Sequence, residues 1–243
     1  MRITADLGLA SAPHRARGGW HPGWLFRTGA KGTWFDPSDR GSLFQDAAGT
    51  IPVLADGQPV GRMLDKSGQG HHATQPVAAA RPTWRTNGHL GWLEFDGVDD
   101  RMTVAAAPLS NPALSICAGL RYMAGNLAWG ALRSRLEVGT YCGLSHPSFT
   151  GPTSNAGGQG FVNGSAAPGD RIALRGLLLA PAVLRVEGAQ AAAFSGQGWQ
   201  ILSYWNTAPP AGQLFGYVEL HGLWGAEAPR LERWMARKTG VAA

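Results

Sequence analysis

The sequence predicts an all-β domain, and three features of the chain lead to this prediction. From Trp34 onward, short apolar runs alternate with turn-forming residues about every 8–12 residues. Glycine and proline are abundant, with 35 and 16 residues, as strands joined by tight turns require. No helical pattern separates most of these runs, so we expect the strands to form an antiparallel sandwich or barrel.

Approximate period-two spacing of apolar residues identifies the individual strands. Side chains two residues apart lie on the same face of a strand, and we expect such pairs to enter the core. The runs that approximate this spacing contain Leu93/Phe95, Met102/Val104 and Ile172/Leu174, each two residues apart, and Val183/Val186, which are three apart. Glycines interrupt several of the runs, which favours bulges and bends.

One helix is expected near the C-terminal end, over about residues 227–239. Pro229 stands early in this stretch, basic residues occupy its last turn, and Gly240 follows as a stop signal. A single apolar stripe at positions i, i+3 and i+4 consists of Leu231, Trp234 and Met235. We expect this helix to lie across the edge or the outside of the sandwich.

The chain is predicted to have two parts, an extended arm at residues 1–33 and a sandwich at residues 34–243. The arm contains glycine and proline without periodicity, and it holds five basic residues against Asp6, so its net charge is +4. Its docking residues are predicted to be Arg15, Arg17, Trp20, Trp24 and Phe26. We expect the arm to dock onto a neighbouring subunit, and the sandwich to stay folded without it. A disordered tail is the alternative.

Charge and hydropathy exclude some classes of protein. Residues 34–243 carry a net charge of only +1, so no nucleic-acid partner is expected. The longest apolar run, at residues 177–184, is short and contains Pro181, so no membrane insertion is expected. No signal peptide is expected either, because Asp6 interrupts the only candidate stretch. Cys117 and Cys142 are interpreted as buried thiols, with a disulfide as the alternative.

Three separated segments resemble the concanavalin A-like, laminin-G-type jelly roll. They are "DKSGQGHHATQ" (65–75), "LEFDGVDDRMTV" (93–104) and "GYVELHGLWGAEAPRLERWMARKTG" (216–240). The opening "WFDPSDRGSLFQDAAGTIPVLADGQPVGRMLDKSG" resembles the version of this domain found in tails, fibres and spikes of bacteriophages and phage-like particles. The resemblance covers roughly residues 34–104 and 213–240.

This resemblance implies a location and a task. The chain would be a structural surface component of a phage or phage-like particle, a head spike or a tail or fibre protein. It would be made in the bacterial cytoplasm, join other virion proteins through residues 1–33 as part of a homo-oligomer or hetero-assembly, and aid adhesion to host cell-surface polysaccharide. The alternative is a carbohydrate-binding module or a glycoside hydrolase of the β-sandwich glucanase type.

The glycoside hydrolase alternative depends on Glu94, Asp96 and Asp99, which have the spacing E-x-D-x-x-D. This pattern differs by one methylene from the catalytic strand of those hydrolases, in which two carboxylates act as nucleophile and acid/base. However, Gly97 favours a break, and apolar alternation resumes at Met102. We therefore expect a hairpin, no catalytic residues and no enzymatic activity.

A calcium site is a further possibility, since several members of the superfamily hold calcium at the sandwich rim. The candidate ligands are Asp65, Asp96, Asp99 and Asp100, which offer hard carboxylate oxygens. A solvated acidic turn is the alternative, and no other cofactor is expected. Near Asp65, we expect Ser67 to help cap a tight turn and His71 and His72 to be structural.

Carbohydrate binding would require exposed aromatic platforms. The candidates are Trp84, Trp129, Trp199, Trp205 and Trp224, each of which has the core as its alternative position. A glycine-, serine- and asparagine-rich loop at residues 145–170 is expected to form the rim of such a site, or else to be a variable connection.

Overall fold

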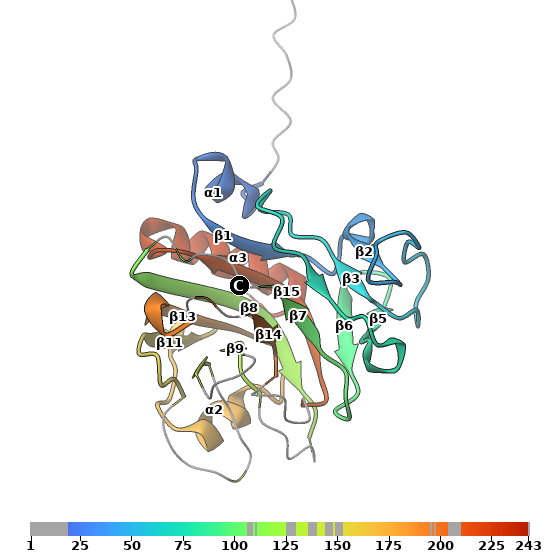
Figure 1. The fold of residues 1–243 in the computed structure, drawn as a ribbon. Coiled ribbons are helices and arrows are strands. Elements are labelled where there is room, and N and C mark those ends of the chain that lie inside the picture. Colours follow the sequence, from blue (N-terminus) through green and yellow to red (C-terminus); the bar gives the residue numbers. More distant parts are fainter. Residues whose placement is uncertain are drawn as a thin grey trace, which may run out of the picture.

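The computed structural model describes residues 19–105, 109, 111–124, 130–135, 140–143, 148, 153–194, 196, 198–203 and 210–242. These residues form two antiparallel sheets that pack face to face (Figure 1). The all-β prediction is therefore confirmed at the level of the fold class. Short 3₁₀ segments lie at Arg40–Ser42, Ala78–Ala80, Ala191–Phe194 and Gly225–Glu227.

The first sheet has eight strands within the described residues. Along its main path the order is β12 (Ser165–Ala166), β11 (Gln159–Val162), β13 (Ala182–Gln190), β8 (Ala113–Tyr122), β15 (Gly212–Leu220), β6 (Gly91–Phe95) and β5 (Thr83–Thr86). The eighth strand, β1 (Gly32–Phe35), also pairs with β15. Since β6 pairs with the start of β15 and β1 with its end, these two strands share one edge of β15.

The second sheet has seven strands within the described residues. Their order is β10 (Tyr141–Cys142), β9 (Arg133–Arg135), β14 (Trp199–Ile201), β7 (Met102–Val104), β4 (Ala73–Thr74), β3 (Arg62–Met63) and β2 (Leu43–Phe44). The main hydrophobic core lies between the two sheets and includes Leu93, Phe95, Met102 and Val104. The core positions predicted from period-two spacing in these two strands are confirmed.

Residues 93–102 do not form the expected hairpin. β6 belongs to the first sheet and β7 to the second, so the turn at residues 96–101 joins the two sheets. Asp100 Oδ2 accepts a hydrogen bond from the Asp96 N–H at 2.9 Å, and Asp96 Oδ1 accepts one from the Val98 N–H at 2.8 Å. The prediction that the acidic residues shape a turn is confirmed, whereas the predicted pairing of the flanking strands is wrong.

The run that contains Ile172 and Leu174 is a helix, α2 (Arg171–Leu177), and not the expected strand. Asp170 caps it, because Asp170 Oδ1 accepts hydrogen bonds from the Ile172 and Ala173 N–H groups at 2.9 and 3.2 Å. Leu174 is buried and Ile172 is exposed, as expected for a helix that covers one end of the core.

The predicted C-terminal helix is confirmed as α3 (Ala228–Thr239), with Gly240 at its end in the left-handed conformation (φ 72°). α3 packs across β8, β13 and β15 on the outer side of the first sheet (Figure 1). Gly119 and Gly216, which face each other on β8 and β15, permit this close approach. A Cβ atom at Gly119 would lie 2.4 Å from Thr239 Cγ2, and one at Gly216 would lie 2.8 Å from Met235 Sδ.

A second hydrophobic cluster lies between α3 and the first sheet, and the predicted arm contributes to it. Trp20, Leu25, Phe26 and Ala30 pack against this cluster, and α1 (Gly23–Arg27) lies beside it (Figure 1). The predicted boundary after residue 33 falls inside β1, which pairs with β15. Residues 19–33 are therefore part of the fold, and the prediction that they form an extended arm is wrong. Arg15 and Arg17 lie outside the described residues.

Candidate functional site

The segment around α1 is held to the sandwich by His21. His21 Nδ1 accepts a hydrogen bond from the Gly23 N–H at 3.1 Å, and the imidazole ring stacks on Trp34 with 5.9 Å between ring centroids. Burial lowers the pKa of His21, and the charges of Arg27 and Lys66 lower it further. A neutral imidazole is the form that accepts this hydrogen bond, so the local charges favour the bond at the start of α1.

A groove of about 260 Å³ lies between the α1 segment and the start of α3. Its lining residues are Trp20, Trp24, Leu25, Thr28, Glu227 and Arg230. The Trp24 side chain is 50% exposed, and the Arg27 guanidinium lies 5.7 Å from the centroid of a Trp24 ring. The groove thus combines an exposed aromatic surface with arginines, a composition common at the centres of protein interfaces.

Exposed positive charge is concentrated on the two segments that flank this groove. Six lysine and arginine side chains are exposed among those that the structure describes, and five of them lie on the α1 segment and α3. They are Arg27, Lys31, Arg230, Arg233 and Arg237. We call these five residues, together with the groove, the α1–α3 face.

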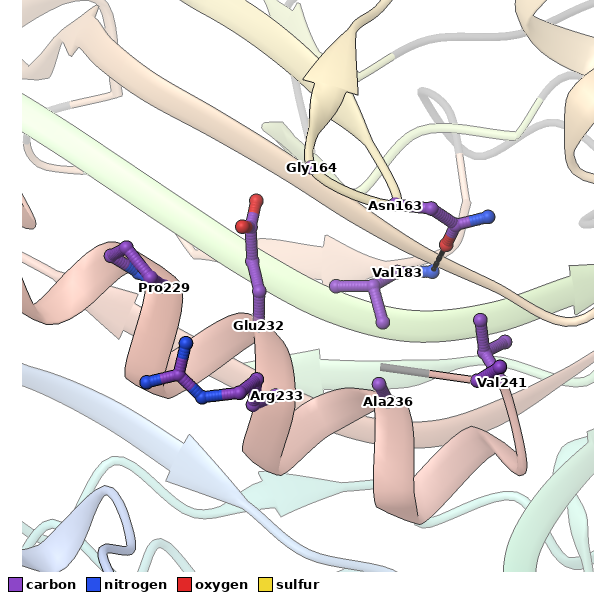
Figure 2. Close-up of a pocket in the computed structure, with 9 residues that line it drawn as sticks. Asn163, Gly164, Val183, Pro229, Glu232, Arg233, Ala236 and Val241 are labelled. Atoms are coloured by element: carbon purple, nitrogen blue, oxygen red, sulfur yellow. Dashed lines mark hydrogen bonds between the residues drawn. The ribbon is translucent and has the colours of Figure 1, made fainter.

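A second groove, of about 170 Å³, runs along the other flank of α3. Figure 2 shows it between α3 and the turn at Asn163 and Gly164, with Arg233 on the helix beside it. Glu232 Oε1 accepts a hydrogen bond from Arg185 Nε at 2.8 Å, so this carboxylate is already engaged with the sheet. Arg233 has no such partner among the described residues.

The sequence pattern already contained the signal for the arginines of α3. Arg230, Arg233 and Arg237 stand at i, i+3 and i+7, on the side of the helix away from Leu231, Trp234 and Met235. From the sequence alone, the basic residues of this stretch predict only the end of a helix. Their role in a binding face depends on the packing of α1 beside α3, which the sequence does not reveal.

Three of the five tryptophans predicted to bind carbohydrate are buried. The exposed fractions of Trp84, Trp199 and Trp224 are 4%, 2% and 3%. Trp84 Nε1 donates a hydrogen bond to the Pro37 carbonyl oxygen at 2.9 Å, Trp199 packs on Tyr217, and Trp224 belongs to the second cluster. Their rings are not available to stack on a sugar, so this prediction is wrong for these three. Trp129 and Trp205 lie outside the described residues.

The predicted recognition loop at residues 145–170 is not one continuous loop. Its second half contains β11 and β12, which pair with each other, and β11 also pairs with β13. Residues 144–147 and 149–152 lie outside the described part of the chain.

The candidate calcium ligands divide into two groups. Carboxylate oxygens of Asp96, Asp99 and Asp100 lie within 4.8 Å of one another, and no further His, Cys, Asp or Glu of the described residues joins them. Asp65 is elsewhere, where its carboxylate accepts hydrogen bonds from the Trp34, Ser67 and His71 N–H groups at 2.9–3.0 Å. Asp65 thus shapes the predicted tight turn, and the four aspartates do not form one site.

Asp100 gives a prediction for the pH dependence of stability. Burial raises the pKa of Asp100 from 3.8 to about 6, and the charges of Asp96 and Asp99 add to this effect. Between these pH values the folded chain holds a proton that the unfolded chain releases, so this carboxyl favours folding less as pH rises. Asp100→Asn is therefore expected to raise the free energy of unfolding at pH 7.5, and the gain should shrink towards pH 4. Urea unfolding at several pH values measures it, and a pH-independent difference would contradict it.

The three carboxylates of the E-x-D-x-x-D pattern do not project from one strand. Glu94 lies on the face of β6 away from the core and pairs with Arg85, whose Nε is 3.2 Å from Glu94 Oε1. Asp96 and Asp99 follow the strand, in the turn between the sheets. The arrangement needed for a nucleophile and an acid/base on one strand is therefore not present at these residues.

A buried charged network between the sheets was not foreseen from the sequence. Arg133 Nη1 on β9 lies 2.6 Å from Glu219 Oε2 on β15, and Tyr217 Oη donates a hydrogen bond to the same oxygen at 2.9 Å. Burial raises the pKa of Glu219, but the Arg133 charge and hydrogen bonds from His221 and Tyr217 outweigh it and hold the pKa below its usual value. The only sequence signal is one acidic residue in the apolar run "GYVEL".

Cys117 is a free, buried cysteine, as the thiol interpretation requires, and burial raises the pKa of its thiol. Among the described residues, no helix is both long enough and apolar enough to span a membrane. Comparisons of the chain with protein-family models, with curated proteins and with solved structures found no match.

Proposed function

We propose that the chain is a structural surface component of a phage or phage-like particle, a head spike or a tail or fibre protein with a concanavalin A-like jelly roll. In this proposal the α1–α3 face attaches the subunit to other particle proteins. The sandwich is then displayed outward, where it aids adhesion to host polysaccharide.

The observation that carries the attachment role is the α1–α3 face itself. It combines a groove containing a half-exposed tryptophan with five of the six exposed cations among the described side chains. Residues 1–18, which include Arg2, Arg15 and Arg17, join the fold directly before Trp20, one of the residues that line the groove. The particle class and the adhesive task are supported by the resemblance of residues 34–104 and 213–240 to tail, fibre and spike proteins.

A truncation and a point variant test this role in cells that produce the particle. Deleting residues 2–18, or replacing Trp24 with alanine, is expected to reduce incorporation of the protein into purified particles at least about ten-fold, as loss of an aromatic interface anchor does. The particles that lack it should also adsorb more slowly to host cells. Quantitative immunoblotting of particles and adsorption rates measure the two effects.

The truncation ends at residue 18 because residues 19–33 pack into the fold. Val77→Ala is the matched control, since Val77 is a similarly exposed apolar residue away from the face. Circular dichroism and thermal melting should show unchanged folding for all three proteins. Normal incorporation of both test proteins, or equal loss in the Val77 variant, would overturn the attachment role.

A further inference from the structure

We infer that the α1–α3 face binds an acidic segment of a partner protein, with a large apolar side chain of that segment in the groove beside Trp24. This inference rests on the proposed attachment role and specifies the chemistry of the partner.

Exposed charge is distributed unevenly over the described side chains. Among the described side chains, the one exposed cation outside the face is Arg40, which the fold uses, because its Nη1 donates to the Leu54 carbonyl oxygen at 2.6 Å and its guanidinium lies over Trp84. The exposed acidic residues among the described side chains, Asp56 and Asp96, lie outside α1 and α3. The groove itself contains one carboxylate of the described residues, Glu227, which is 32% exposed and paired with Arg230, so the face presents a net positive charge.

The arginines of α3 have N–H donors that are not paired with a carboxylate of the described residues. Neither Arg233 nor Arg237 makes an ion pair with a carboxylate among the described residues, and Arg230 makes only one, with Glu227 at 3.1 Å. An arginine has five N–H donors, and its strongest partners are carboxylates and phosphates held by two parallel hydrogen bonds. Arg230 and Arg237 are seven residues apart, which is roughly 10 Å along a helix. A partner with several carboxylates over that length matches this spacing.

The groove can also hold an apolar side chain of a partner. Trp20, Trp24 and Leu25 give it apolar walls, while Arg230 lies at the same opening. Its volume of about 260 Å³ exceeds that of a single leucine, isoleucine or phenylalanine side chain, so one such side chain fits. Tryptophan and arginine are among the residue types enriched in the hot spots of protein interfaces.

These features favour a protein partner over a nucleic acid. A nucleic acid is held by cations along a continuous track of phosphates. Here the unpaired cations are few, and an apolar groove adjoins them. A segment that alternates carboxylates with an apolar side chain uses both parts of the face.

The experiment uses the full chain and a short fluorescein-labelled peptide in which one leucine is flanked on both sides by paired glutamates. Fluorescence anisotropy at low ionic strength is expected to show binding. The double substitution Arg233→Ala and Arg237→Ala should weaken it about five- to ten-fold, the size expected for two exposed charge pairs. Trp24→Ala should weaken binding of this peptide but not of a peptide with alanine in place of leucine.

The control is the double substitution Leu54→Glu and Val77→Glu, which lowers the net charge by the same two units at exposed positions elsewhere. It should leave the affinity nearly unchanged. Equal weakening by this control would reduce the effect to net charge and overturn the inference. So would the absence of binding, or tighter binding of single-stranded oligothymidylate with the same arginine dependence, which would assign the face to nucleic acid.

The outcome separates this inference from the attachment role. If the arginine variants bind the peptide normally while the Trp24 variant is missing from particles, the partner chemistry is wrong and the attachment role stands. If the peptide binds as expected but the Trp24 variant is incorporated normally, the face binds acidic segments and the attachment role fails.

Discussion

Replacing Arg133 with methionine is expected to lower the free energy of unfolding by about 3–5 kcal/mol, the usual cost of removing one partner from a buried ion pair. The side chains of Arg133 and Glu219 are only 3% and 2% exposed, and they join the two sheets through the interior of the sandwich. Without the guanidinium, Glu219 would keep the hydrogen bond from Tyr217 but lose its compensating charge. The pKa of Glu219 would then rise, because burial would no longer be opposed by Arg133.

Urea unfolding of the single and double variants measures this effect. Arg133→Met combined with Glu219→Gln should recover much of the loss, since glutamine removes the buried charge and still accepts the Tyr217 hydroxyl. Arg101→Met, a change of the same kind at a half-buried arginine with no carboxylate partner among the described residues, is the control. A loss below about 1 kcal/mol in Arg133→Met would show that the pair contributes little.

Replacing Gly32 with valine is expected to separate β1 from β15 and release the α1 segment, at a cost of about 3 kcal/mol. Gly32 has a φ of 154°, and a Cβ atom there would lie 1.9 Å from the carbonyl oxygen of Glu219. That atom belongs to the backbone of the central strand, so β1 must move instead. The packing of Trp20, Leu25 and Phe26 on the second cluster would be lost with it.

Hydrogen exchange localises this change, because the amides of residues 32–35 and His221 should lose protection while those of β8 and β13 keep it. The His221 N–H donates to the Lys31 carbonyl oxygen at 2.8 Å in the intact structure. Gly19→Val is the control in the same segment, since no atom lies within 4 Å of a Cβ at that position. Unchanged protection at residues 32–35 in the Gly32 variant would contradict the expectation.

Local patterns in the sequence predicted where strands and helices form better than they predicted which strands pair with each other. Period-two spacing placed Leu93, Phe95, Met102 and Val104 in the core, and capping signals located α3. Spacing determines which face of a strand is buried, but it does not indicate which strand lies alongside. The turn at residues 96–101 therefore looked like a hairpin although it joins two sheets. The spacing of Ile172 and Leu174 resembles that of a strand, but these residues form α2, which the Asp170 carboxylate caps.

The candidate site was harder to predict because it depends on contacts between distant segments. A tryptophan in a short run has the same local pattern whether it is buried, like Trp199, or exposed, like Trp24. The arm was placed outside the fold because several of its anchoring partners lie about 200 residues later, in α3. The Arg133–Glu219 pair, with 86 positions between its members, has no local pattern at all.

The pairing of β1 with β15 also determines when the α1–α3 face can form during synthesis. β1 is among the first strands translated, yet its partner occupies residues 212–220 and the helix beside α1 occupies residues 228–239. At about 5–20 residues per second, α1 waits roughly 10–40 s for these elements. A nascent chain that stops before residue 228 lacks α3 and therefore cannot form the α1–α3 face.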